Sequence, residues 1–190
     1  MRRAVLASQN ANKLAELREG LTGWELEPLV ADTWPEETGE TYYENARIKA
    51  LFGREHAPAE DWVLGEDSGI ETVALDGGPG LHSARWAPHG DQADALLERL
   101  AGERERGARM VAELVALSPA GEQIHVRGEL EGELATERRG SAGFGYDPIF
   151  IPAGYDATVA ELGDAWKRVH SHRARAAQAL LAAIRSGGTS

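Results

Sequence analysis

"RRAVLASQNANKLAELREGL", residues 2–21, begins with an apolar run and continues without a break into a helical pattern. We interpret residues 2–8 as a short buried strand, and residues 10–21 as a helix because three leucines recur there at helical spacing. A strand that opens directly into a helix aims free backbone N–H groups at the connecting loop, which is a common way to bind an anion. This pairing predicts a fold in which strands and helices alternate.

The rest of the chain continues the alternation and then adds a hairpin. We expect residues 61–75 to form a strand, a tight turn and then a strand or short helix, and residues 76–86 to be irregular because of their glycines and proline. The other expected elements are strands at residues 24–30 and 147–152, helices at 42–55, 91–102 and 171–186 (with Ser171 as cap), and a hairpin of 109–118 and 123–135. The sequence therefore predicts one α/β domain, residues 1–190, with a central mixed β-sheet flanked by helices.

Composition excludes several classes of protein. With 190 residues, 42% hydrophobic and 27% charged, the chain is typical of a soluble globular protein. No apolar run approaches the ~20 residues that a membrane-spanning helix needs. The absence of cysteine excludes disulfides and thiolate metal ligands, and it fits a cytoplasmic protein. The net charge of −11 argues against nucleic-acid binding, which requires a cationic surface, so we expect neither a nucleic-acid nor a membrane partner.

The basic residues carry a second signal. There are 20 of them, and only Lys13, Lys49 and Lys167 are lysines. Lysine provides a compact point charge suited to phosphate, but chance retention on a solvated surface explains the three equally well. Lys13 stands in the first turn of its helix, where a cation is poorly placed against the helix dipole unless a phosphate is bound there. The competing interpretation of this polar segment is a simple helix cap, since Asn10 and Asn12 both favour that position.

Two acid-rich segments, "PEETGE" at 35–40 and "GEDSG" at 65–69, are candidates for metal binding. Acidic turns are usually solvated surface, but Asp67 follows an apolar run and so should lie at the mouth of a buried strand. Glu36 and Asp67 together could provide oxygen ligands to Mg²⁺, which takes one or two carboxylates plus phosphate oxygens. The scattered histidines do not indicate zinc, and no Walker-type phosphate loop is present.

Two further segments have the composition of recognition sites. "SAGFGYDPIF", residues 141–150, combines glycines that permit close backbone approach with the Phe144 ring face and the Asp147 carboxylate. "KRVHSHR", residues 167–173, gathers basic side chains at a helix start. The alternatives are that the aromatic residues belong to the core and that the basic cluster is a solvated face.

Read together, these segments resemble the inosine triphosphate pyrophosphatase family, which hydrolyses non-standard purine nucleoside triphosphates. The resemblance covers essentially the whole chain in order. It consists of the Ser8, Asn10, Lys13 and Glu16 pattern, "EETGETYYENARIKA", "EDSGIETVALDGGPGLHSAR", "GFGYDPIF", and Thr158 to Leu162 followed by Lys167 and the Ser171-His172-Arg173 run.

The resemblance implies Mg²⁺-dependent hydrolysis of ITP, dITP and XTP to the nucleoside monophosphate and pyrophosphate, in a two-lobed homodimeric protein with its active-site cleft between the lobes. Asp67 would accept the proton of the attacking water, and Glu36 and Asp67 would bind the metal. The residues implied to bind substrate are Ser8, Gln9, Asn10, Ala11, Asn12 and Lys13 for the triphosphate, Ser68, then Phe144, Gly145, Tyr146 and Asp147 for the nucleoside, and Lys167, His172 and Arg173. The role of Lys49, packing or a distant phosphate contact, stays open.

The sequence departs from the family pattern at Gln9, where glycine is usual, and at Glu66, which replaces an aspartate and which we expect to matter little if Asp67 provides the chemistry. Two other functions remain open: a Maf-type pyrophosphatase with different base specificity, and a nucleotide-binding module without turnover. The two acids argue against the binding module, because a pure phosphate binder gains nothing from them without a metal.

Overall fold

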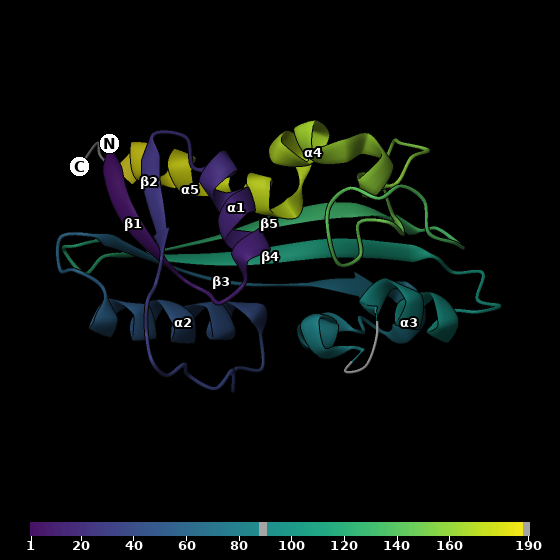
Figure 1. Ribbon diagram of the computed structural model, residues 1–190, viewed down its shortest axis with the longest axis horizontal. Coiled ribbons are helices and arrows are strands. Elements are labelled where there is room, and N and C mark those ends of the chain that lie inside the picture. Colours follow the sequence, from purple (N-terminus) through teal and green to yellow (C-terminus); the bar gives the residue numbers. More distant parts are fainter. Residues whose placement is uncertain (88–90, 188–190) are drawn as a thin grey trace. The chain divides into compact units, whose positions relative to one another are not determined.

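The computed structural model describes residues 1–87 and 91–187. The helices and strands largely follow the order expected from the sequence (Figure 1). They are β1 (Arg2–Ala7), α1 (Ala11–Gly20), β2 (Trp24–Pro28), α2 (Tyr42–His56), β3 (Trp62–Thr72), the 3₁₀ helices η1 (Val73–Leu75) and η2 (Gly80–Arg85), α3 (Gln92–Arg99), β4 (Gly107–Leu117), β5 (Gln123–Leu134), β6 (Phe150–Pro152), α4 (Val159–His170) and α5 (His172–Gly187).

The strands form one six-stranded mixed sheet in the order β2-β1-β3-β4-β5-β6. β1 pairs in parallel with β2 and with β3, which places Leu6 beside Leu64. β5 pairs with β6 in the antiparallel sense, and the chain turns between β4 and β5 where Gly121 N–H donates to Ser118 O. A mixed α/β sheet flanked by helices is therefore confirmed.

The chain divides into two compact units. The first unit contains Met1–Asp67, Ala112–Gly128 and the chain from Arg173, and the second unit contains Ser68–Val111 and Glu129–His172. β3, β4 and β5 each contribute residues to both units. Whether the 190 residues act as the single domain expected from the sequence stays a prediction.

The first unit has a core on each face of its strands (Figure 1). On one face, α1 and α5 pack against Leu6, Leu64 and Leu114 through Leu17 and Leu180. On the other face, Ala46 and Ala50 of α2 pack against Val63 and Val115. Because neighbouring residues of a strand point to opposite faces, consecutive side chains of β3 meet different helices.

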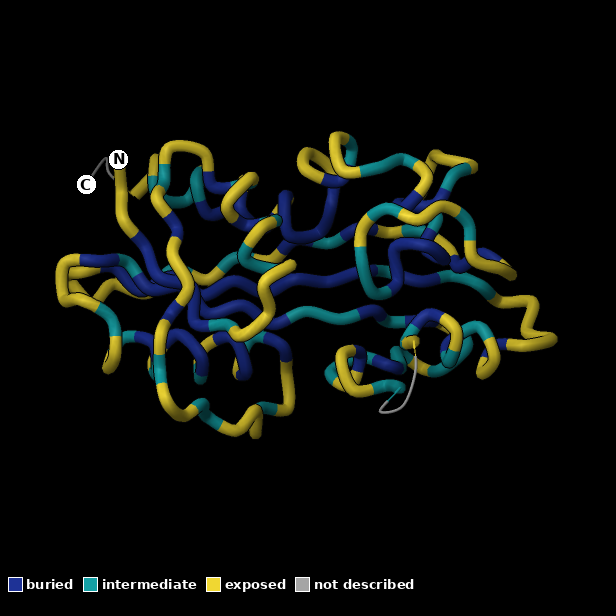
Figure 2. Tube along the Cα trace, in the orientation of Figure 1, coloured by how far each residue is buried: buried dark blue, intermediate teal, exposed yellow. Residues whose placement is uncertain are grey.

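The second unit has a separate core of its own. Ile70, Met110 and Leu130 from the strands pack with Leu96 of α3 and with Phe150 of β6. Figure 2 shows in both units that buried residues follow the strands, while exposed residues lie in loops and on outward helix faces.

The turn expected inside residues 61–75 does not form. β3 runs without interruption from Trp62 to Thr72, so Asp67 lies within the strand and not at its mouth. The reason is Gly65, which makes a close packing contact instead of a turn. A Cβ at this position would collide with the backbone of Ala46 and Ala50, so its absence allows α2 to approach β3.

Helix α4 was not expected from the pattern of apolar residues. It begins with a capping box, in which Thr158 accepts from the N–H of Glu161 and Glu161 accepts from the N–H of Thr158. Gly163, with φ of 78°, interrupts its backbone. Ser171 ends α4 and directly precedes α5.

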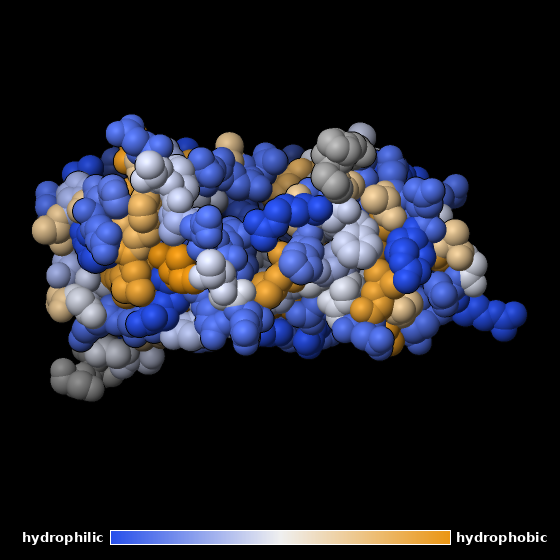
Figure 3. Space-filling view, turned by 90° about the horizontal axis from the view of Figure 1, so that it is seen from below, coloured by the Kyte–Doolittle hydropathy of each residue, from blue (hydrophilic) through white to orange (hydrophobic). Residues whose placement is uncertain are grey.

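On the face shown in Figure 3, hydrophilic residues dominate and hydrophobic residues form separate patches. Within residues 1–87 and 91–187, none of the helices combines the length and the apolar character needed to cross a membrane.

Candidate active site

The connection between β1 and α1 is organised by Asn10. Its side chain accepts from the backbone N–H of Asn12 and of Lys13, at 3.0 and 3.2 Å, which makes it the N-cap of α1. Ser8 Oγ accepts from the N–H of Asn10 at 3.2 Å. Gln9, Asn10, Ala11 and Asn12 are exposed. Asn10 therefore caps α1, the loop is accessible to a ligand, and phosphate binding there stays a prediction.

Glu66 is a fully buried carboxylate held by two cations. Lys13 Nζ lies 2.7 Å from Glu66 Oε2, and Arg173 Nε donates to Glu66 Oε1 at 2.9 Å. Burial alone would raise the pKa of Glu66, but Lys13 and Arg173 outweigh it and hold that pKa well below its usual range. Arg173 also donates to Glu16 at 2.9 Å, so α1, β3 and α5 meet in one charge network.

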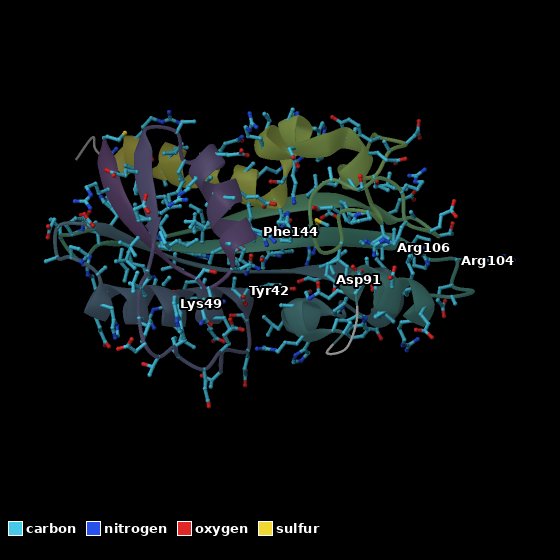
Figure 4. The ribbon with its side chains drawn as sticks, in the orientation of Figure 1. Tyr42, Lys49, Asp91, Arg104, Arg106 and Phe144 are labelled. Atoms are coloured by element: carbon cyan, nitrogen blue, oxygen red, sulfur yellow. The ribbon has the colours of Figure 1, made fainter. Side chains whose placement is uncertain are left out.

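Asp67 lies on the opposite face of β3, where its partners come from α2. Lys49 Nζ donates to Asp67 Oδ1 at 3.0 Å, and Asn45 Nδ2 donates to Asp67 Oδ2 at 3.3 Å (Lys49 is labelled in Figure 4). Burial raises the pKa of Asp67 and outweighs the opposing effect of Lys49 and Lys13. A carboxylate with a raised pKa is a better proton acceptor than an ordinary one.

The loop at residues 36–40 is tied to the same cluster. Glu37 Oε1 lies 2.6 Å from Lys49 Nζ, and Gly39 N–H donates to Asn45 Oδ1 at 2.8 Å. Burial alone would lower the pKa of Lys49, but the neighbouring Asp67 and Glu37 carboxylates raise it. Glu37, the neighbour of the predicted ligand Glu36, is thus a glutamate of this loop that shares the Lys49 ammonium group with Asp67.

The donor set around Lys49 is of the kind that suits Mg²⁺. Carboxylate oxygens from a loop and from β3 converge on one positive charge, and Mg²⁺ typically uses one or two carboxylates and completes its shell with water and phosphate oxygens. Residues 1–87 and 91–187 contain no group of three or more histidine, aspartate or glutamate side chains that could hold a metal ion by themselves.

The second unit contains a separate cluster around Asp147. Lys167 Nζ lies 2.5 Å from Asp147 Oδ2 and 4.1 Å from the centroid of the Phe144 ring, where the ammonium group faces the ring (Phe144 is labelled in Figure 4). The N–H of Phe144 donates to the same carboxylate at 2.8 Å. A Cβ on Gly143 would collide with Asp147, so this loop conformation requires glycine there.

Tyr146 follows the alternative considered from the sequence, because its side chain belongs to the core. Its hydroxyl group donates to Ser83 O at 2.8 Å, and burial raises its pKa. Of the remaining predicted residues of the second unit, Ser68 and Gly145 are partly exposed and His172 is buried. The binding roles of these residues stay predictions.

The structure thus divides the predicted residues into two sets. The first unit contains Ser8 to Lys13, Glu36, Asp67 and Arg173. The second unit contains Ser68, Phe144 to Asp147, Lys167 and His172.

Two residues of the first-unit cluster, Glu37 and Asn45, were not singled out from the sequence. Glu66, noted from the sequence as a replacement for aspartate, is the anion that holds Lys13 and Arg173, and the expectation that this replacement matters little stays a prediction. The position of Glu66 directly before Asp67, after an apolar run, was the available signal. Lys49, whose role was open, contacts Asp67 directly.

Comparison with known proteins gives consistent matches. A family model described as the Ham1 family matches residues 4–183. A protein of Symbiobacterium thermophilum named dITP/XTP pyrophosphatase is 47% identical over 184 residues, which cover 92% of this chain and 91% of that protein. A protein of Gloeobacter violaceus with the same name is 42% identical over 190 residues, covering 98% and 96%.

Solved structures agree with the sequence matches. The Staphylococcus aureus Ham1 protein superposes with a TM-score of 0.85 at 33% identity, covering 98% of this chain and 100% of that chain. A Mycobacterium abscessus structure described as a nucleoside-triphosphatase / dITP/XTP pyrophosphatase has a TM-score of 0.72 at 39% identity, covering 94% and 98%.

Proposed function

The chain belongs to the Ham1 family, and from this premise we propose that it is a nucleoside triphosphate pyrophosphatase acting on non-standard purine nucleotides. ITP, dITP and XTP are hydrolysed to the nucleoside monophosphate and pyrophosphate, which removes them from the nucleotide pool. The names of the relatives support this substrate class, and the family match confirms the resemblance seen in the sequence. The observation that carries the proposal is Asp67, a buried carboxylate of raised pKa held by two donors of α2.

Asp67 is the general base in this proposal. One of its carboxylate oxygens takes a proton from water, and the water oxygen then attacks the α phosphorus. The bond between the α phosphorus and the oxygen that bridges to the β phosphate breaks, and pyrophosphate leaves with that oxygen. Lys49 and Asn45 hold the carboxylate during the transfer, since each donates to one of its oxygens.

Mg²⁺ is the proposed cofactor, held by Glu36 and Asp67. The carboxylates of Glu37 and Asp67 converge on Lys49, which supports a cation site beside Asp67, and the assignment of Glu36 rests on the family resemblance. When bound, the ion would neutralise phosphate charge and lower the pKa of a nearby water.

Residues Ser8 to Lys13 are assigned to the triphosphate. The start of α1 aims backbone N–H groups and the partial positive charge of the helix at this loop, a favourable place for an anion. Lys13 provides the full charge. The buried carboxylate of Glu66 holds this ammonium group at 2.7 Å.

The nucleoside is assigned to the second unit. The Phe144 ring offers a surface for the purine, and stacking of a base on an aromatic ring contributes about 1–3 kcal/mol. Arg173 donates to Glu66 and Glu16, so we assign recognition of the 6-keto oxygen to His172. ATP presents an amino group at that position. An unsatisfied buried donor costs about 1–3 kcal/mol, which predicts roughly ten- to a hundred-fold discrimination.

We further propose that the protein is a cytoplasmic homodimer that binds neither nucleic acid nor membrane. The net charge of −11 supports the last two points, because a general nucleic-acid or anionic-lipid binder needs a cationic surface.

The test is a substrate panel with the purified protein. Pyrophosphate release is measured from ITP, dITP, XTP, ATP, GTP and UTP, each with and without Mg²⁺. We expect release from the first three that depends on Mg²⁺ and exceeds release from ATP. Equal rates with ITP and ATP would contradict the 6-keto assignment, preference for UTP would indicate a Maf-type enzyme, and tight ITP binding without release would indicate a binding module.

A further inference from the structure

Two side chains of α2, Asn45 and Lys49, lie one helical turn apart, and each contacts both the loop at residues 36–40 and Asp67. We propose that Asn45 is a positioning residue of the reaction: it fixes the orientation of the Asp67 carboxylate and ties the acidic loop to it. This inference rests on the proposed function of Asp67 as general base. Asn45 itself is not expected to touch the reacting atoms.

The orientation of the Asn45 amide follows from its first partner. A backbone N–H group can only donate, so the side-chain atom 2.8 Å from Gly39 N must be the acceptor Oδ1. The amino group Nδ2 therefore faces Asp67 Oδ2, 3.3 Å away, where it can only donate. Asn45 is 3% exposed, so water does not compete strongly for either contact.

Lys49 completes the arrangement from the next turn of α2. Its ammonium group donates to Asp67 Oδ1 at 3.0 Å, while Asn45 donates to Oδ2. Rotation of the Asp67 carboxylate about its Cβ–Cγ bond would break both hydrogen bonds. In a buried environment, an unmade hydrogen bond is costly. Two donors on opposite oxygens therefore hold one orientation of the base.

The loop at residues 36–40 packs closely against the N-terminal end of α2. A Cβ on Gly39 would lie 2.7 Å from Asn45 Oδ1 and 2.6 Å from Glu44 Cβ, so only glycine allows this approach. The N–H of Glu40 and of Thr41 donates to Glu44 Oε2, at 2.7 and 3.1 Å. Asn45 also contacts Asp67 of β3, so together with Lys49 it links the loop to Asp67.

Two variants of the protein separate the contact of Asn45 with Gly39 from its contact with Asp67. Asn45→Ala removes both. Asn45→Asp keeps an oxygen that accepts from Gly39 N–H but replaces the donor to Asp67 with a second carboxylate oxygen. Phe52 lies on α2 and packs against Trp34, so Phe52→Ala, which removes this packing and leaves the side chains of Asn45 and Asp67 unchanged, is the control for reduced stability. Arg47→Ala is the control for an exposed position of α2.

Steady-state kinetics with ITP and hydrogen exchange of the Gly39 amide by NMR are measured below the unfolding transition of every variant. We expect kcat to fall roughly ten- to a hundred-fold in both Asn45 variants, the effect of losing one hydrogen bond to a charged group, with little change in KM. Protection of the Gly39 amide should be lost in Asn45→Ala and kept in Asn45→Asp. Both controls should keep the wild-type kcat.

Wild-type kcat in Asn45→Asp would overturn the inference, and so would unchanged Gly39 exchange in Asn45→Ala. A kcat loss in Phe52→Ala equal to that of Asn45→Ala would also overturn it, because the effect would then follow stability alone. The proposed function fails if the wild-type protein shows no turnover. The positioning role of Asn45 fails if the wild-type protein turns over ITP and the Asn45 variants do so equally well, so the two failures are distinguishable.

Discussion

At the scale of single residues, the chain places each of its lysines against a carboxylate. Their side chains are 8–12% exposed, so the interpretation as chance retention on a solvated surface was wrong. Lysine keeps a compact charge on a flexible stem, which suits a buried site that must also meet phosphate. The pairs are Lys13 with Glu66, Lys49 with Asp67, and Lys167 with Asp147.

Replacing Asp67 tests the base directly. In Asp67→Asn the side chain keeps its shape but cannot accept the proton, so we expect kcat to fall by about 10²–10⁴ while nucleotide binding is largely retained. Pyrophosphate release and calorimetric titration with ITP measure the two quantities. Asp32→Asn, the same change at an exposed position, should leave both unaltered. Near-normal turnover in Asp67→Asn would remove this residue from its assigned role.

The depressed pKa of Glu66 predicts how stability depends on pH. The unfolded chain protonates this carboxyl group near its ordinary pKa of 4.5, whereas the folded chain does not until the pH is much lower. Its contribution to stability is therefore full at neutral pH and declines as the pH falls below that ordinary value, at about 1.4 kcal/mol per pH unit.

The non-titrating variant Glu66→Gln should be less stable than wild type at pH 7, and the difference should narrow on acidification. Urea denaturation at several pH values between neutrality and the acid range gives the free energies of unfolding. A gap that stays constant over this range would show that Glu66 is not ionised against Lys13 and Arg173 in the folded state.

At the scale of elements, local patterns predicted most helices and strands but misread β3. Glycines on both sides of two acids are typical of a turn. What they do here depends on a contact distant in sequence, since Gly65 packs against the α2 backbone. No local signal contains that information. Helix α4 differs in this respect, because the Thr158 and Glu161 capping box is readable in the sequence and only the interruption at Gly163 obscured the pattern.

The packing of Gly65 predicts a sensitive position. In Gly65→Ala the new methyl group would meet the backbone of Ala46 and Ala50, so α2 must move away from β3. We expect a loss of roughly 2–4 kcal/mol in the free energy of unfolding. Turnover should fall as well, because the same helix presents Lys49 and Asn45 to Asp67. Urea denaturation and pyrophosphate release measure the two effects.

Gly187→Ala is the matched control, since a Cβ there meets no atom within 4 Å. It should leave both quantities close to wild type. If Gly65→Ala also left the free energy of unfolding and the turnover unchanged, the close approach of α2 to β3 would not be a constraint on the fold.

At the scale of the whole molecule, the order of strands and helices gave the α/β class, while the charge network could not be predicted from it. Glu66 and Asp67 are neighbours in sequence, yet one contacts α1 and α5 and the other contacts α2. Strand alternation explains this only once β3 is known to be continuous through both residues. Reading a turn there concealed which helix each acid would meet.

Three strands shared by both units predict cooperative unfolding. Loss of either unit would leave β3, β4 and β5 with half of each strand unsupported. We expect one calorimetric transition whose van't Hoff and calorimetric enthalpies agree, and Gly65→Ala, a change in the first unit, should shift all of it. Two separable transitions, of which only one moves, would mean that each unit folds independently.

The burial of all three lysine side chains also governs how the native chain reacts with acylating reagents. Succinimidyl esters and acetic anhydride require an accessible, deprotonated amine, so a dye or surface linker applied to the native protein should react slowly with these three lysines. Acylation of the lysines reports that their ion pairs have opened, so the extent of lysine labelling measures how much of the native structure remains.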